Sequence, residues 1–367
     1  KNKSIEAIRQ DIIAKPILNV PAWTVALLDP TTGTLPRRKT DINGTIKYSE
    51  AIANTGAPGV LFAASTGWGH VRNFQEHRTT LKTGGDAKLG STLKQALIRI
   101  EDPLEQNLRL LKELNDWGYA IVWTRRGANL PPDASDSEVA DNLLPIAKAA
   151  AEIGLPMGVY SISTVDGACL RPSAVKLLLE KLGKDASRFV VAVKITEPVF
   201  EESTQLFLEE SALENKKIVQ GWDAFYTRAM QAGKRADGLN QCGATSGAAA
   251  CMVKAFDNMY KFARAEDWSS VAQIQKAVTE AFYSMQGVDK DKFPDLQIAK
   301  FVMGLGHPLT EERTFKDGER LVSTVEKLVE EKETQMGGRL IAESLLIMGK
   351  GEYASPFYGR LNKLIND

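Results

Sequence analysis

Apolar runs with the length of a β-strand recur along this sequence, and most of them are followed by a stretch with the pattern of an α-helix. The eight predicted strands lie at 23–29, 59–65, 95–100, 119–124, 157–163, 189–196, 217–222 and 237–243. The runs at 95–100 and 237–243 have the weakest β-strand composition. Strands that alternate with helices form right-handed βαβ units around a parallel sheet. Eight such units predict a closed (β/α)8 barrel.

The main alternative is an open, doubly wound sheet. The first predicted strand is followed by PTTGT at 30–34 and lacks the GxGxxG turn that usually marks such a sheet. After the eighth run only helical patterns remain, including a helical hairpin over 247–278 and an amphipathic helix over 317–335. We therefore expect a barrel over residues 1–245 and a C-terminal helical extension over 246–367 that packs on it.

The composition is that of an ordinary globular protein. Charged residues make up 25% and hydrophobic residues 43%, and 46 basic residues balance 46 acidic ones. Such a balance gives no overall electrostatic reason to bind nucleic acid or an anionic membrane. No window holds about 18 consecutive apolar residues, and the first residues lack the apolar core of a signal peptide. We therefore expect a cytoplasmic protein with neither a nucleic-acid nor a membrane partner.

The side chains that usually bind metals are few and widely separated. The chain has three cysteines and three histidines, which are Cys169, Cys242, Cys251, His70, His77 and His307. None of them has CxxC or HExxH spacing, so neither a disulfide framework nor a zinc site is indicated. A GxSxG nucleophile turn is also missing. We expect no metal ion.

A lysine lies at the end of the apolar run RFVVAVKIT at 188–196. Alternation along a strand places Val190, Ala192 and Lys194 on one face, with Lys194 at the carboxyl end, where the active sites of barrels lie. Apolar surroundings lower the pKa of a lysine because burial disfavours the ammonium. The neutral amine can then attack a ketone to form a Schiff base. The alternative is a strand-end lysine whose ammonium reaches solvent.

Two other strand ends carry groups that suit the same chemistry. Tyr160 lies in GVYSIS, and its phenol can move the proton that imine formation and C–C cleavage require, although a tyrosine can also simply fill the barrel. Ser65 and Thr66 lie in AASTGWG at the end of the second predicted strand. The hydroxyls and N–H groups of such a turn can hold a small carboxylate, or they form an ordinary turn or cap. Together these groups predict a site for a 2-oxo acid.

The order of these motifs resembles that of the dihydrodipicolinate synthase / N-acetylneuraminate lyase family of class I, pyruvate-type aldolases. GVLFAASTGWG is similar to the family's strand with a GTTGE-type turn, GVYSIS to its strand with the catalytic tyrosine, and VVAVKIT to its strand with the catalytic lysine. EHRTTL, VQGWDAF and ADGLNQCGA are similar to further elements of the family. The resemblance covers roughly residues 20–285.

The resemblance implies a role for each of these residues. Lys194 would form the Schiff base, and Tyr160 would shuttle the proton. Ser65, Thr66 and Gly67 would hold the carboxylate of pyruvate. The resemblance also implies a homo-oligomer (a dimer or a tetramer) without a metal or an organic cofactor.

The chain departs from the family where the second substrate would bind. Trp68 follows the turn where the family usually has Glu, so we expect it to contact the substrate and to reshape the pocket. Dihydrodipicolinate synthases place an arginine after the tyrosine, whereas residues 165–166 are Val and Asp, which argues against dihydrodipicolinate synthesis itself. WTRRG replaces the turn with a second tyrosine, and Arg125 and Arg126 can instead bind an acidic group. Asn240, in the eighth predicted strand, is expected to face the substrate.

These features predict a class I lyase that makes or cleaves a C–C bond between a 2-oxo acid such as pyruvate and an aldehyde-type substrate. A Schiff-base dehydratase of a sugar-derived 2-oxo acid is a close alternative, because it would use the same lysine. A third alternative is a non-catalytic family member that binds a 2-oxo acid as a sensor or scaffold.

Overall fold

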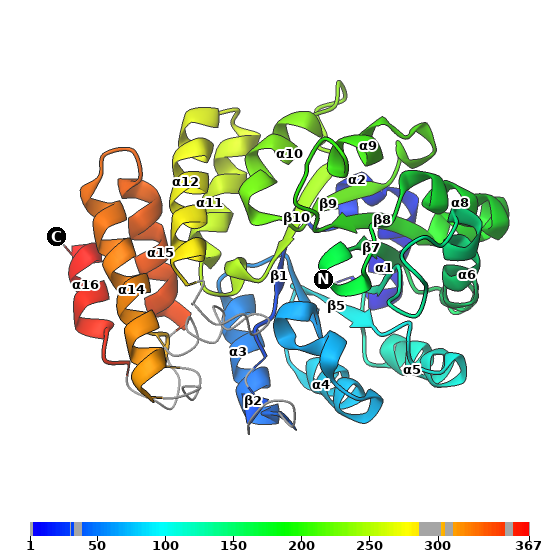
Figure 1. Cartoon of the computed structure of the whole chain (residues 1–367), viewed down its shortest axis with the longest axis horizontal. Helices are drawn as coiled ribbons and strands as arrows, with labels where there is room; N and C mark the ends of the chain where they lie inside the picture. Colours follow the sequence, from blue (N-terminus) through cyan, green and yellow to red (C-terminus); the bar gives the residue numbers. More distant parts are fainter. Residues whose placement is uncertain are drawn as a thin grey trace.

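Eight parallel strands form a closed barrel surrounded by helices (Figure 1). The structure is a computed structural model. It describes residues 3–29, 31–32, 39–285, 302–304, 311–348 and 355–366. The closed sheet confirms the predicted (β/α)8 barrel and excludes the doubly wound alternative, whose sheet would be open.

The strands follow one another around the barrel in the order β1-β10-β9-β8-β7-β6-β5-β4. Their bounds are β1 Trp23–Ala26, β4 Gly59–Phe62, β5 Leu93–Ile98, β6 Ile121–Arg125, β7 Met157–Ser161, β8 Val190–Ile195, β9 Lys217–Gln220 and β10 Cys242–Ser246. Outside the barrel, β2 (Thr31–Thr32) pairs antiparallel with β3 (Lys39–Thr40). All eight barrel strands point the same way, so their carboxyl ends meet at one end of the barrel.

The predicted position of the eighth strand is wrong. The prediction placed it at 237–243, whereas β10 begins at Cys242. The residues before it form a tight turn, in which Asp237 accepts a hydrogen bond from the Leu239 amide and Gly238 has φ +82°. Glycine adopts this left-handed conformation without steric cost. The strand itself is rich in small residues, and a Cβ on Gly243 would lie 2.9 Å from the Ala22 carbonyl oxygen, so close packing determines this strand more than β-propensity does.

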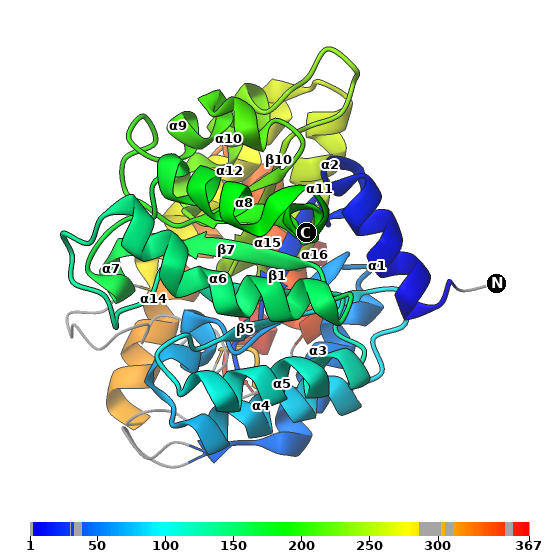
Figure 2. The ribbon, with the colours of Figure 1, turned by 90° about the vertical axis from the view of Figure 1, so that its right-hand side faces the viewer.

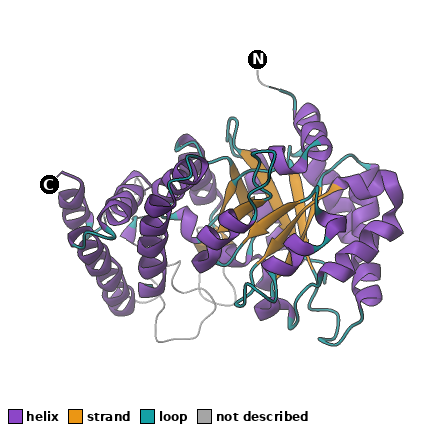
Figure 3. Ribbon diagram, turned by 90° about the horizontal axis from the view of Figure 1, so that it is seen from above, coloured by secondary structure: helices purple, strands orange, loops and turns teal. Residues whose placement is uncertain are grey.

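Helices cover the outside of the barrel (Figure 3). They are α3 Ile42–Asn54, α4 Phe74–Asp86, α5 Leu104–Asp116, α6 Asp136–Glu152, α8 Pro172–Ala186, α9 Thr204–Glu209 and α10 Tyr226–Ala232. Shorter helices are η1 Ser65–Gly67, η2 Gly69–Val71, α7 Ser163–Asp166, η3 Ser187–Phe189, η4 Ser211–Leu213, η5 Asp223–Phe225 and η6 Ala248–Ala250. The amphipathic pattern of α5 is typical: Leu110, Leu111 and Leu114 are buried in the main hydrophobic core.

The amino end of the barrel is covered by the first two helices, α1 (Ile5–Ala14) and α2 (Pro16–Asn19). The Arg9 guanidinium donates to the Tyr119 carbonyl, just before β6, at 3.0 Å. The Lys217 ammonium, at the start of β9, donates to the Ile17 carbonyl at 3.1 Å. Figure 2 shows α1 and α7 at opposite ends of the barrel. The carboxyl ends of the strands therefore lie at the end that α1 and α2 leave open.

The C-terminal helices pack beside the barrel (Figures 1 and 3). They are α11 Val253–Arg264, α12 Trp268–Ser284, α14 Glu311–Glu330, α15 Gln335–Met348 and α16 Tyr358–Asn366. α15 contacts α11, α12, α14 and α16, and also α3 of the barrel. Leu321, Val325 and Ile341 belong to the same buried cluster as barrel residues. The barrel and the C-terminal helices therefore share one hydrophobic core. The division into two domains between residues 245 and 246 stays a prediction.

Candidate active site

Three side chains form a row across neighbouring strands at the carboxyl end of the barrel. Arg125 of β6 is the register partner of Tyr160 of β7, and Tyr160 is the register partner of Lys194 of β8. Register partners on parallel strands point to the same side of the sheet. Tyr160 packs with Trp123 in the cluster that fills the barrel. The row therefore faces inward, and the structure brings Lys194 and Tyr160 together.

Lys194 is buried in the mouth of the barrel. Its exposed fraction is 4%, so its ammonium does not extend into bulk water as the solvent-reaching alternative requires. Nζ lies 4.1 Å from the centroid of the Tyr160 ring. Burial lowers the pKa of Lys194 to about 7, and the charge of Asp223 opposes this shift. A large fraction of the side chain is then a neutral amine at neutral pH, which a Schiff-base nucleophile requires.

Tyr160 is held by hydroxyl groups. Its Oη lies 2.9 Å from Oγ1 of Thr196. Burial raises the pKa of Tyr160 well above its usual value, and hydrogen bonding with Thr196 and Ser65 opposes the rise, so the phenol stays protonated at neutral pH. Thr196 was not predicted from the sequence, although its position two residues after Lys194 places it on the same face of the strand. A Cβ on Gly221 would clash with Thr196 Oγ1, so this position requires glycine.

The turn after β4 brings Ser65 and Thr66 to the same end of the barrel. The amides of Gly67 and Trp68 donate to carbonyl groups within the turn, at 2.9 and 3.1 Å. The Ser65 hydroxyl interacts with Tyr160. Thr66 Oγ1 is buried and has no hydrogen-bond partner within the described residues. The amides of Gly67 and Trp68 are therefore already used within the turn, whereas the hydroxyls of Ser65 and Thr66 are among the groups that it can offer to a carboxylate.

The shape of this turn depends on its backbone and on one buried histidine. Trp68 has φ +63°, and its side chain is buried. A Cβ on Gly69 would clash with the Ala63 carbonyl oxygen, so only glycine fits there. His77 of α4 lies with Nδ1 3.2 Å from the Gly69 carbonyl oxygen and Nε2 2.8 Å from that of Leu97. Burial lowers the pKa of His77 to about 4, so the imidazole is neutral and its single N–H donates to one of these two carbonyl groups.

A carboxylate that the sequence analysis did not single out lies near Lys194. Asp223, in η5 after β9, accepts a hydrogen bond from Ser246 Oγ at 2.6 Å and another from the Tyr226 hydroxyl. Burial raises the pKa of Asp223, and these two hydrogen bonds and the charge of Lys194 oppose the rise. The motif VQGWDAF contained this residue, but only as part of the resemblance.

The structure does not bring Asn240 to this cluster. Asn240 precedes β10, and its Nδ2 donates to the Met230 carbonyl at 2.7 Å. Its own carbonyl accepts a hydrogen bond from Lys217 at the amino end of β9. The residue of this region that reaches the cluster is Ser246, at the carboxyl end of β10. The error follows directly from the shifted position of the eighth strand.

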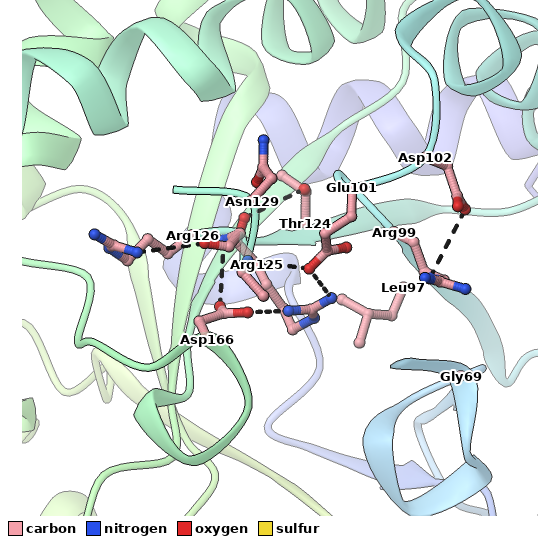
Figure 4. A network of polar contacts seen from close by, with 12 residues as sticks. Gly69, Leu97, Arg99, Glu101, Asp102, Thr124, Arg125, Arg126, Asn129 and Asp166 are labelled. Atoms are coloured by element: carbon pink, nitrogen blue, oxygen red, sulfur yellow. Dashed lines mark hydrogen bonds and ion pairs between the residues drawn. The ribbon is translucent and has the colours of Figure 1, made fainter. Parts of the chain in front are cut away.

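The two arginines after β6 have different surroundings (Figure 4). Arg125 is 2% exposed and forms ion pairs with Asp166 and Glu101. Arg126 is equally buried, and its guanidinium donates to the Pro131 carbonyl at 2.7 Å. Figure 4 shows Arg126 pointing away from Arg125. Both guanidinium groups are therefore already bound by the protein, which does not support the expectation that they hold an acidic group of the substrate.

No group of three or more His, Cys, Asp or Glu side chains in the described ranges is arranged to hold a metal ion. No helix in these ranges is both long enough and apolar enough to cross a membrane. His307 lies outside the described residues.

Comparison with solved structures identifies the class of fold. The chain has the barrel fold of dihydrodipicolinate synthases, N-acetylneuraminate lyases and 2-keto-3-deoxygluconate aldolases. This result agrees with the resemblance found in the sequence. No protein-family profile matches the chain, and no curated protein does.

Three of the similar structures illustrate how much of the chain is covered. A dihydrodipicolinate synthase has 17% sequence identity and a TM-score of 0.67, over 84% of this chain and 99% of that one. N-acetylneuraminate lyase from Mycoplasma synoviae has 16% identity and a TM-score of 0.66, over 83% and 97%. A prophage protein of the dihydrodipicolinic acid synthase family from E. coli K12, in complex with pyruvate, has 15% identity and a TM-score of 0.69, over 83% and 98%. At these identities the similarity establishes the fold.

Proposed function

We propose that this protein is a class I lyase that binds pyruvate or another 2-oxo acid as a Schiff base on Lys194 and makes or cleaves a C–C bond. The observation that carries the proposal is the buried Lys194 amine, whose pKa is lowered to about 7, beside the protonated phenol of Tyr160. The hydroxyls of Ser65 and Thr66 at the same end of the barrel would bind the carboxylate. The fold is shared with lyases and aldolases, and with the prophage protein that was solved in complex with pyruvate.

The first half of the proposed reaction forms the Schiff base. Nζ of Lys194 attacks C2 of the 2-oxo acid, and the carbonyl oxygen becomes the hydroxyl of a carbinolamine. Tyr160 donates its proton to this hydroxyl, which leaves as water, and the C2–Nζ iminium remains. The phenolate of Tyr160 then takes a proton from C3, so that the iminium becomes an enamine and the phenol is restored.

The second half forms the C–C bond. C3 of the enamine attacks the carbonyl carbon of an aldehyde, and Tyr160 donates a proton to the oxygen that becomes an alkoxide. Water then adds to the iminium, the phenolate of Tyr160 takes up the proton that is released, and the product leaves Lys194 as a ketone while the amine becomes neutral again. The same steps in reverse cleave the bond. Each step uses a proton that Tyr160 holds or accepts, which is why its hydroxyl must lie close to Nζ.

Reduction with borohydride in the presence of pyruvate, followed by peptide mass spectrometry, tests the proposal. We expect a stable pyruvyl adduct on Lys194. Lys217 is the internal control, because it is equally buried and burial lowers its pKa to about 8, but it lies at the covered end of the barrel. An adduct on Lys217 and not on Lys194, or no adduct with pyruvate or several other 2-oxo acids, would contradict the proposal.

Analysis of the products separates the proposed lyase from the alternatives. A lyase forms or consumes an aldehyde together with the 2-oxo acid. A Schiff-base dehydratase instead releases water from a sugar-derived 2-oxo acid with its carbon chain intact. A binding protein without catalysis would form the adduct on Lys194 and then turn over neither class of substrate.

We also propose, from the resemblance and the composition, that the protein is a cytoplasmic homo-oligomer (a dimer or a tetramer). Light scattering coupled to size-exclusion chromatography measures the mass in solution. A mass of 40.2 kDa, that of one chain, would contradict the oligomer.

A further inference from the structure

The end of β6 and the segments after β5 and β7 bring one arginine and two carboxylates together at the mouth of the barrel (Figure 4). Arg125 ends β6 and stands next to Tyr160 in the inward-facing row. Its Nη2 lies 2.6 Å from Glu101 Oε1, and its Nη1 pairs with Asp166. We call Arg125, Glu101 and Asp166 the mouth triad. It lies on one side of Tyr160, and Lys194 lies on the other.

The mouth triad is fixed by the backbone as well as by its charges. The Ala128 amide donates to Glu101 Oε1 at 3.1 Å, and the Gly127 amide donates to Asp166 Oδ2 at 3.3 Å. An anion on the substrate would have to displace one of these carboxylates from a buried guanidinium. Breaking a buried ion pair is costly because it leaves an uncompensated charge. Arg125 is therefore a poor receptor for a second carboxylate or a phosphate.

The charges of the mouth triad do not cancel. Burial opposes ionisation of Glu101, but Arg125 and backbone amides hold its pKa below the usual value. Burial raises the pKa of Asp166 to about 6, against the opposing effect of Arg125, so this group is also mainly ionised at neutral pH. Two carboxylates thus face one guanidinium. In the neighbouring pair, Arg99 Nε lies 3.9 Å from Asp102 Oδ2, so one positive and one negative charge add no net charge. The Arg126 guanidinium donates to the Pro131 carbonyl and not to the mouth triad.

One oxygen of the mouth triad is left without a donor. Glu101 Oε2 is buried, and it accepts no hydrogen bond from the described part of the chain. A buried acceptor is costly unless a donor satisfies it. A carboxylate or phosphate on the substrate has no proton to give at neutral pH. A hydroxyl has one, and it can donate to this oxygen.

We propose that the mouth triad is the subsite for the second substrate, and that it selects a neutral, hydroxyl-bearing aldehyde over one that carries a carboxylate or phosphate. The hydroxyl donates to Glu101, and the excess negative charge repels an anionic group. Asp166 fixes Arg125 and adds to the repulsion. This inference rests on the proposed function, because it concerns the partner of the 2-oxo acid bound at Lys194.

Matched pairs of aldehydes test the inference. The enzyme is loaded with pyruvate, and kcat/KM is measured for 4-hydroxybutanal against succinic semialdehyde and for glyceraldehyde against glyceraldehyde 3-phosphate. We expect both neutral aldehydes to be accepted and to be preferred over their anionic counterparts by at least about tenfold. In Glu101→Gln and Asp166→Asn, the preference should shrink by about fivefold or more, since each removes one negative charge at constant size. The control is Asp237→Asn, which removes a carboxylate from the turn before β10 at the amino end of the barrel, and it should leave the preference within about twofold of wild type.

The outcomes separate this inference from the proposed function. Borohydride trapping of pyruvate on Lys194 is run on every variant, and its absence from the wild type would refute the proposed function itself. If the adduct forms, the subsite is refuted by any of three results. These are a preference for the anionic aldehydes, acceptance of neither neutral aldehyde, and a Glu101→Gln variant whose preference equals that of Asp237→Asn.

Discussion

Two buried lysines point into the barrel from neighbouring strands, one at each end. Lys194 of β8 and Lys217 of β9 are both 4% exposed, and burial lowers their pKa values to about 7 and about 8. Lys217 Nζ donates to the carbonyl groups of Ile17 at 3.1 Å and Asn240 at 2.8 Å, beneath the helices that cover the amino end. Lys194 Nζ lies over the Tyr160 ring and makes no hydrogen bond with any residue in the described ranges.

This difference shows what a lowered pKa does and does not indicate. Burial alone lowers the pKa of both amines, so the shift does not mark the reactive one. Lys217 is satisfied by two carbonyl groups and has a structural role. Lys194 has a proton donor beside it, unsatisfied hydrogen-bonding capacity, and a position at the end of the barrel where active sites lie. The combination of these features, rather than the pKa, makes Lys194 the candidate nucleophile.

Replacing Lys194 by methionine should have the largest effect on the chemistry. Lys194→Met should abolish the borohydride adduct and reduce turnover by at least about 1000-fold, because the covalent step has no other nucleophile. Its stability toward urea should stay equal or rise, because a buried amine without a hydrogen-bond partner is removed. A Lys194→Met enzyme that still forms the adduct would contradict the assignment.

Tyr160→Phe should separate binding from turnover. The adduct on Lys194 should still form but more slowly, because Tyr160 also assists the loss of water from the carbinolamine. Turnover should fall by about 100-fold or more, because the proton transfers at C3 and at the aldehyde oxygen need the phenol as well. Steady-state kinetics and mass spectrometry on one preparation measure both. Thr196→Val is the matched control: it keeps the phenol and removes only its hydrogen-bond partner, so a smaller loss is expected. Unchanged turnover in Tyr160→Phe would remove the phenol from the mechanism.

The pH dependence of adduct formation should follow the neutral form of Lys194. Because its pKa lies at about 7 in the folded protein, the amine is protonated and unreactive below that pH and neutral above it. The rate of adduct formation at low pyruvate should therefore rise by about tenfold from pH 6 to pH 8 and then level off. Tyr160 stays protonated over this range and does not reverse the trend. A rate that falls with rising pH would contradict this account.

Lys217→Met should affect stability and leave the chemistry intact. Two buried carbonyl groups lose their donor, which we expect to lower the free energy of unfolding by about 1–3 kcal/mol. The rate at which the folded variant forms the adduct on Lys194 should match that of the wild type. Urea unfolding and mass spectrometry measure the two quantities. Loss of the adduct from a folded Lys217→Met protein would mean that the two ends of the barrel are not independent.

The smallest expected effect concerns Asp223. Its charge raises the pKa of Lys194 against the larger effect of burial. Asp223→Asn removes this charge, so the pH at which adduct formation is half-maximal should shift downward. The comparison variant is Asp237→Asn, which alters a carboxylate in the turn before β10. An upward shift in Asp223→Asn would show that the carboxylate does not stabilise the ammonium.

Much of the fold was predictable from the sequence because strand and helix patterns are local. Seven of the predicted strands agree in position with observed strands, whereas the eighth was predicted at 237–243 and lies at Cys242–Ser246. Its small residues have little β-propensity, and contacts with distant residues such as Ala22 determine its position. Placing Asn240 at the mouth was a direct consequence of that error.

The candidate site was predictable where one strand contained the signal. Lys194 and Tyr160 stand out because a polar group ends an apolar run, and Thr196 follows from alternation along β8. The mouth triad was not predictable, since its three members come from the end of β6 and from the segments that follow β5 and β7. Arg125 was therefore interpreted as a receptor for an acidic group, and only the folded structure reveals the two carboxylates that bind it.

The central claim is that Lys194 at the open end, and not Lys217 at the covered end, binds the 2-oxo acid covalently. A crystal structure of the protein soaked with pyruvate tests it most directly. We predict continuous electron density from Nζ of Lys194 to C2 of the ligand, the ligand carboxylate against the hydroxyls of Ser65 and Thr66, and an unmodified Lys217. Pyruvate bound without a covalent bond, or joined to any other lysine, would contradict the account.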